Sequence, residues 1–168
     1  MNIIDILTQK PETTIALSSV VIAFCALLVS LQQMAIQRKH NRLSVRPLLQ
    51  SGRVSTTQFP FQWHIRNVGS GPAIVTKYRV TIGSQTMDFP SNKLLMSVLS
   101  SEGIKGYKGS YSFDSKSCMK AEEEIRLIEF DVSEVPNCLE KIERIYWEIE
   151  YQSLYDEKFS VSFTAKAA

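Results

Sequence analysis

The run Thr13–Gln37, TTIALSSVVIAFCALLVSLQQMAIQ, contains no charged residue over 25 positions. Its apolar centre is Ile15–Leu31, where ten of the 17 residues are Leu, Ile, Val or Phe. A helix rises about 1.5 Å per residue, so about 20 residues cross a hydrocarbon layer about 30 Å thick. The run therefore predicts a transmembrane helix over residues 13–37.

The charges on either side of this helix predict its orientation. Asp5, Lys10 and Glu12 precede it, and they do not form the basic start of a removable signal peptide. A basic juncture over residues 38–46 follows it and contains Arg38, Lys39, Arg42 and Arg46. Basic flanks normally stay in the cytoplasm, so we expect the N-terminus outside and the C-terminus inside. These four cations would then contact the negative cytoplasmic leaflet, each contributing about 1 kcal/mol.

Small and polar residues follow one face of the expected helix. At alternating steps of four and three they form a stripe, which is Glu12, Ala16, Ser19, Ala23, Ala26, Ser30, Gln33 and Gln37. The large residues Leu17, Val20, Phe24, Leu27, Leu31 and Met34 lie on the opposite face. Small residues let helices in lipid approach closely, and a mean step of 3.5 residues is typical of a left-handed bundle. The stripe predicts self-association; the alternative is that Ala and Ser are simply common in membrane helices.

Residues 1–12 form a separate N-terminal segment. Ile3, Ile4, Ile6 and Leu7 precede Pro11 and predict a short amphipathic turn in the outer interface, with a frayed terminus as the alternative.

Residues 47–168 are enough for one soluble domain with one core. The formal net charge of +2, from 19 basic and 17 acidic residues, is too balanced to indicate a nucleic-acid-binding protein by itself. Cys118 and Cys138 show no Cys-x-x-Cys spacing and are expected to be free thiols in a reducing compartment.

The domain alternates apolar and polar residues with period two, which is typical of antiparallel β-structure. Strands are expected at Leu48–Ser55, around Phe61–Ile65, at Ile74–Ile82, Gln85–Phe89, Tyr107–Phe113, Ile125–Val132, Ile145–Tyr151 and Phe159–Ala165. Short helices are expected at Asn92–Leu99 and Pro136–Ile142. The pattern predicts a mainly β protein, with an antiparallel β-sandwich of immunoglobulin-like or Greek-key kind and a small barrel as the alternative.

Asn67-Val68-Gly69-Ser70-Gly71-Pro72-Ala73 separates two of these strands. Its glycines permit positive φ and its proline restrains the next strand, so we expect a tight corner. A phosphate-binding loop would need Lys-Ser/Thr and a helix after the glycines, and both are missing.

Together with Arg46-Pro47-Leu48 and the segment Ile149–Asp156, this corner resembles a broad group of bacterial proteins, mostly of unassigned function. Members have one N-terminal membrane helix and a cytoplasmic β-sandwich. The resemblance implies a location in the bacterial inner membrane, and it informs fold far more than activity. Many members have Gly in the final hairpin, where this chain has Tyr155-Asp156-Glu157-Lys158.

Residues for catalysis are sparse. His40 lies in the basic juncture and His64 on a strand, neither beside a second ligand, while Asp88, Asp114 and Asp131 are expected on the surface. No metalloprotease, serine-hydrolase or zinc spacing occurs, so we expect no enzyme, no cofactor and no metal site.

The segment Ser100–Lys120 is the best candidate for an anionic ligand. Lys105, Tyr107, Lys108 and Tyr111 interleave with glycines there, and Lys116 and Lys120 follow. Lysine charge and tyrosine stacking suit a nucleotide or single-stranded oligonucleotide. An ordinary exposed loop and edge strand is the alternative.

Two functions follow from these patterns. In the first, the protein is a membrane effector of bacterial antiphage defence. About four or more copies would assemble through the helix, and a cytoplasmic signal would open a pore lined by the stripe. This organisation is similar to small membrane-spanning effectors of abortive-infection systems. In the second, the chain is a static anchor or scaffold whose sandwich binds a cytoplasmic partner protein.

Overall fold

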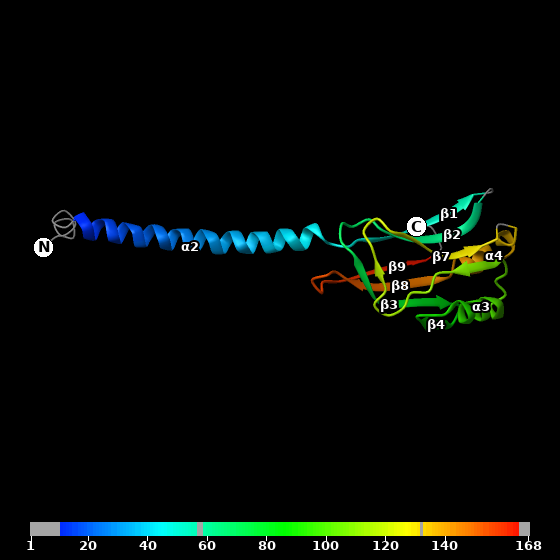
Figure 1. Ribbon diagram of the computed structural model, residues 1–168. Helices are drawn as coiled ribbons and strands as arrows, with labels where there is room; N and C mark the ends of the chain where they lie inside the picture. Colours follow the sequence, from blue (N-terminus) through cyan, green and yellow to red (C-terminus); the bar gives the residue numbers. More distant parts are fainter. Residues whose placement is uncertain (1–10, 57–58, 132, 165–168) are drawn as a thin grey trace. The chain divides into compact units, whose positions relative to one another are not determined.

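A computed structural model describes residues 11–56, 59–131 and 133–164 (Figure 1). The chain divides into two compact units between Leu43 and Ser44, and each is considered by itself. The amphipathic turn expected at residues 2–8 lies outside the described residues.

The first described element is α2 (Pro11–Ser44). Proline is well tolerated at a helix start, and no further Gly or Pro occurs before Pro47. Glu12 in the first turn and Arg42 in the last turn complement the helix dipole. Within it, Glu12–Ser44 is long and apolar enough to cross a membrane. The helix predicted over 13–37 is confirmed, and it continues through most of the basic juncture.

The second unit contains two antiparallel sheets, which confirms the mainly β sandwich. The first sheet has the order β1 (Leu49–Thr56), β2 (Phe59–Asn67), β7 (Glu124–Phe130) and β5 (Tyr107–Ser110). The second has the order β4 (Gln85–Asp88), β3 (Ala73–Ile82), β8 (Tyr146–Gln152) and β9 (Lys158–Thr164). A two-residue strand, β6 (Cys118–Met119), also pairs with β3; it was not predicted, because two residues carry no alternation.

Two short helices interrupt the strands close to their predicted positions. They are α3 (Asn92–Ser101) and α4 (Val135–Ile142). Ser91 precedes α3, and its side chain accepts a hydrogen bond from the backbone N–H of Leu94, which satisfies one of the free donors at the helix start.

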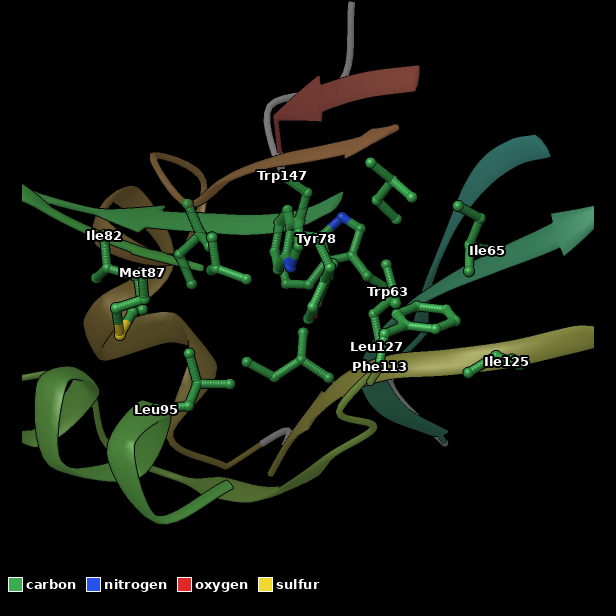
Figure 2. Packing of buried hydrophobic residues seen from close by; sticks show 14 of the residues in the cluster. Trp63, Ile65, Tyr78, Ile82, Met87, Leu95, Phe113, Ile125, Leu127 and Trp147 are labelled. Atoms are coloured by element: carbon green, nitrogen blue, oxygen red, sulfur yellow. The ribbon is translucent and has the colours of Figure 1, made fainter. Parts of the chain in front are cut away.

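The core lies between the two sheets and is rich in aromatic rings (Figure 2). Trp63 from β2 and Trp147 from β8 meet with ring centroids 5.3 Å apart, so the two sheets are joined by their largest side chains. Trp147 also stacks on Phe163 of β9 at 5.4 Å. Such pairs add about 1 kcal/mol each to the burial of their apolar area.

Constant alternation along the strand predicts that Ile74 and Thr76 share a face with Tyr78, and this prediction is wrong at the first residues of β3. A β-bulge between Val75 and Lys77 shifts the register against β8. Val75 therefore points into the core with Tyr78 and Val80, whereas Ile74 is half-buried and Thr76 is exposed. An extra residue in one strand reverses the side-chain phase, and a pattern read at constant period two does not detect it.

Candidate functional site

All the residues of the stripe lie on α2 and are exposed. The hydroxyls of Ser19 and Ser30 donate to the carbonyls of Ile15 and Ala26, each at 2.8 Å. These hydroxyl hydrogens are satisfied within the helix, so the serines can lie in an apolar environment without another donor or acceptor. Ser19 and Ser30 are thus able to pack against another helix without trapped water.

The predicted membrane-surface cations divide into two groups. Arg38, Lys39 and Arg42 are exposed on the last turns of α2. Arg46 lies beyond the helix, and its guanidinium carbon is 4.8 Å from the ring centroid of Phe159 on β9. This cation–π contact ties Arg46 to the sandwich.

Asn67 is fully buried where the chain enters the sandwich. Its side-chain carbonyl accepts from the backbone N–H groups of Leu48 and Gly69, at 3.2 and 3.1 Å. Its side-chain amide donates to the carbonyls of Gly71 and Lys120, at 2.8 and 3.1 Å. One amide thus joins residues before β1 to the β2–β3 corner and to the turn before β7. Sequence reasoning placed Asn67 in the corner but missed this role, because Leu48 and Lys120 are distant from it in sequence.

Gly69 and Gly71 correct a second expectation. Neither has positive φ. A Cβ on Gly69 would lie 2.4 Å from the backbone nitrogen of Leu48, and one on Gly71 only 1.7 Å from the carbonyl oxygen of Val45. The glycines are needed because residues 45–48 cross directly over the corner.

The candidate residues for an anionic ligand do not all converge. Lys105 and Tyr107 line one hollow of about 350 Å³ beside Met96 of α3. Lys108 instead forms an ion pair with Asp131 at 3.2 Å. Tyr111 packs edge-on against Phe113 and lines a different hollow.

The remaining lysines of this segment lie further away. Lys120 precedes β7, whereas the partner of Lys108 follows the end of that strand. The seven residues of β7 therefore separate Lys120 from the Lys108–Asp131 ion pair by about 20 Å. The segment therefore contributes two neighbouring candidates, Lys105 and Tyr107, and not one lysine-rich site.

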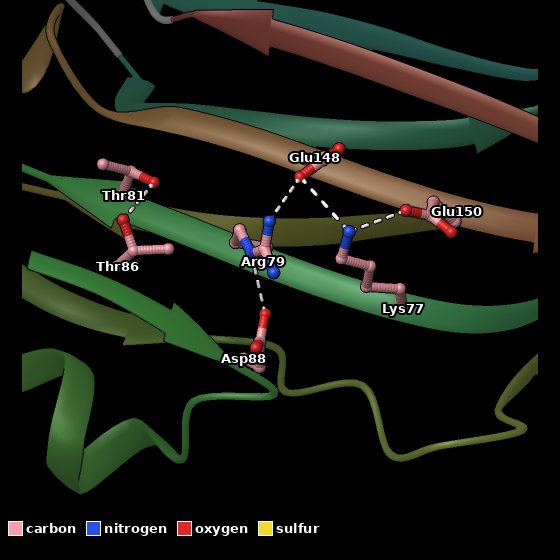
Figure 3. A network of polar contacts seen from close by, with 7 residues as sticks. All are labelled: Lys77, Arg79, Thr81, Thr86, Asp88, Glu148 and Glu150. Atoms are coloured by element: carbon pink, nitrogen blue, oxygen red, sulfur yellow. Dashed lines mark hydrogen bonds and ion pairs between the residues drawn. The ribbon is translucent and has the colours of Figure 1, made fainter.

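A chain of ion pairs that sequence reasoning missed crosses the outer face of the second sheet (Figure 3). Arg79 of β3 contacts Asp88 of β4 at 2.8 Å and Glu148 of β8 at 3.2 Å. Lys77 contacts Glu150 at 2.7 Å. The alternating pattern of these strands could have placed the charged side chains on the outer face. Only the pairing of the strands shows that opposite charges lie next to each other.

These contacts shift the ionisation of the groups. The hydrogen bond to Glu150 raises the pKa of Lys77, and the hydrogen bond from Arg79 lowers the pKa of Asp88. Each charge is offset by a neighbour, so the chain is suited to joining strands β4, β3 and β8 and not to binding an ion.

Two of the other candidate catalytic groups, His64 and Asp131, contact neighbouring residues. The ring of His64 lies against Gly52 on the neighbouring strand. Asp131 accepts hydrogen bonds from the backbone N–H and hydroxyl of Ser133, and these bonds lower its pKa. Within residues 11–56, 59–131 and 133–164, no group of three His, Cys, Asp or Glu could hold a metal ion.

Of the sites predicted from the sequence, the stripe, the basic flank of Arg38, Lys39 and Arg42, and the hollow beside Lys105 remain candidates. No protein-family model matches the chain, and no curated protein matches it.

Proposed function

We propose that this chain is a single-pass protein of a bacterial inner membrane that self-associates through α2 and holds its β-sandwich in the cytoplasm to bind a partner. One observation carries the proposal: Glu12–Ser44 is a long apolar helix, and none of its apolar window is buried within the protein. A helix with so much exposed apolar surface needs lipid or other helices around it. The basic flank of Arg38, Lys39 and Arg42 supports the cytoplasmic orientation.

The stripe supports self-association because it combines small residues with internally satisfied serines. Backbones can approach each other at Ala23 and Ala26. Leu27 lies outside the stripe, about 100° around the helix from Ala26 and not directly opposite it. The partner protein would bind the sandwich, and a nucleotide or oligonucleotide would use Lys105 and Tyr107.

Self-association can be tested by cross-linking the full chain in detergent. We predict that Ala23→Leu and Ala26→Leu lose the cross-linked oligomers, because leucine separates the backbones. Leu27→Ile is the matched control and should retain them. Equal behaviour of all three variants would show that the stripe does not drive assembly.

A second function is favoured by the polar stripe residues and by the buried Asn67 junction. We propose that, in this alternative, the protein is an antiphage effector whose assembly forms a pore. At least about four copies would turn Ser30 and Gln33 inward. The hydrogen bonds of Asn67 attach residues 48 and 67–71 to one another, so a change in the sandwich would reach the chain that leads to α2. A signal can open such a pore only by binding one state better than the other.

Membrane potential separates the two functions. A pore predicts that expression without its regulator depolarises cells, and that Ser30→Leu combined with Gln33→Leu abolishes this while the protein stays in the membrane. Unchanged potential and growth, with and without phage challenge, would leave the anchor as the function.

A further inference from the structure

One end of the sandwich contains the segment through which the chain joins α2, together with two connections between strands. In the first sheet, the start of β1 pairs with the end of β2, with Leu49 opposite Asn67. In the second, the start of β3 pairs with the end of β8, with Ile74 opposite Gln152. We call this the junction end, and it comprises residues 44–48, 68–72 and 153–157. Figure 1 shows the β2–β3 corner and the β8–β9 hairpin at this same end of the two sheets.

Four large apolar or aromatic side chains project from the junction end. Their exposed fractions are 54% for Leu48, 44% for Val68, 59% for Leu154 and 45% for Tyr155. The backbone N–H of Val68 donates to the carbonyl of Leu48, so these two residues are neighbours. We call the four residues the apolar rim. Single exposed apolar residues are ordinary, but their gathering at one end of a domain indicates an interaction surface.

The hairpin holds its part of the rim in a defined conformation. Ser153 is fully buried, and its hydroxyl oxygen accepts from the backbone N–H groups of Tyr155 and Glu157. Asp156 adopts the left-handed conformation, with φ of 59°. Asp tolerates this conformation better than most residues, and the turn thereby presents Leu154 and Tyr155 outward.

We propose that the apolar rim rests in the headgroup interface of the bilayer that α2 spans. The inference rests on the proposed function. Ser44, the last residue of α2, accepts a hydrogen bond from Ser70 in the β2–β3 corner, so the junction end begins where the helix ends. The helix rises only about 10 Å between Gln37 and Ser44. Because the headgroup layer is about 5–8 Å deep, the rim is tethered close to lipid.

The side chains of the rim fit this environment. Tyrosine is enriched at membrane interfaces, where its ring meets the apolar layer and its hydroxyl meets water. The junction end has no excess of positive charge, because its one cation, Arg46, is accompanied by Asp156 and Glu157. The contact should therefore depend on apolar insertion and not on anionic lipid.

A tryptophan placed in the rim can report its contact with lipid. The full chain is reconstituted in phosphatidylcholine vesicles with brominated acyl chains, which quench tryptophan at short range. The test variant is Leu154→Trp. The matched control is Met96→Trp on α3, an equally exposed apolar position at the other end of the sandwich. Trp63 and Trp147 are buried in every variant and report that the sandwich is folded.

We expect Leu154→Trp to lose fluorescence on bromination while Met96→Trp keeps it. Adding Leu48→Ser and Tyr155→Ser to Leu154→Trp should restore the fluorescence. Absence of quenching at position 154 in vesicle-bound protein would overturn the rim contact alone, and a blue-shifted but unquenched emission would assign the rim to a protein partner or a second copy. Quenching that needs anionic lipid would also overturn it. Release of the chain from vesicles by carbonate would instead refute the membrane anchor.

Discussion

Asn67 shows how one residue joins the chain before β1 to the β2–β3 corner of the sandwich. A buried amide satisfies several backbone groups that would otherwise lack partners, and burying such groups unpaired is costly. We predict that Asn67→Ala lowers the free energy of unfolding by at least about 2 kcal/mol. Thermal unfolding of the full chain in detergent, followed by the emission of the buried tryptophans, measures the change.

Asn92→Ala is the control for this substitution. Asn92 accepts a hydrogen bond from Ser110 on the exposed surface, where water can replace it. Its loss should cost less than about 1 kcal/mol. Equal destabilisation by the two substitutions would contradict the role of Asn67.

The two glycine environments give a second prediction at the residue scale. Gly71→Ala places a Cβ against backbone atoms of Val45. These atoms cannot move aside as the end of a flexible side chain could. We expect the free energy of unfolding to fall by about 1–3 kcal/mol. Gly109→Ala meets nothing within 4 Å and should change stability little. The same thermal unfolding experiment compares them, and a neutral Gly71→Ala would show that residues 45–48 shift freely.

At the scale of elements, the ion pairs join three strands and make stability depend on pH. The carboxyl of Asp88 has a pKa below its usual 3.8 because Arg79 donates a hydrogen bond to it. A lowered folded pKa stabilises the protein above the unfolded pKa, and this contribution is lost as the pH falls through the folded value. The ion pairs on the outer face of the second sheet should therefore contribute less to the stability of the protein in acid.

We predict that Asp88→Asn is less stable than the unmodified chain near pH 6 but loses less stability between about pH 5 and pH 2.5. Arg79→Gln should flatten the same curve, since it removes the donor that lowers the pKa of Asp88. Unfolding temperatures measured across this pH range test both variants. Curves parallel to that of the unmodified chain would show that the contact does not form in solution.

At the scale of the whole molecule, the proposed topology depends on the basic flank after the span. We predict that the protein resists extraction by carbonate. We also predict that a reporter that functions in the cytoplasm is active when fused after Ala168, whereas one that functions only in the periplasm is inactive. Replacing Arg38, Lys39 and Arg42 by Glu should reduce the cytoplasmic population, because these charges hold the C-terminal side inside. A fusion to the unmodified chain that is active only in the periplasm would reverse the topology.

Much of this protein was predictable from local pattern. An uncharged run of sufficient length indicates a helix that can span a membrane, and period-two alternation located the strands, because both signals depend on neighbours along the chain. The stripe was likewise visible, since helix geometry alone places its residues on one face. The structure extends the predicted α3 by two residues at its end and the predicted α4 by one residue at its start.

Contacts between distant segments were decided only by the tertiary structure. The bulge after Val75, the partners of Asn67 and the pairing of Arg79 with Glu148 require strands to be placed side by side. Gly71 could be recognised as a corner, but the reason for its glycine appears only where another backbone crosses it. Local periodicity and composition carry no information about which segments meet, because side-chain packing and strand register select those contacts after the elements exist.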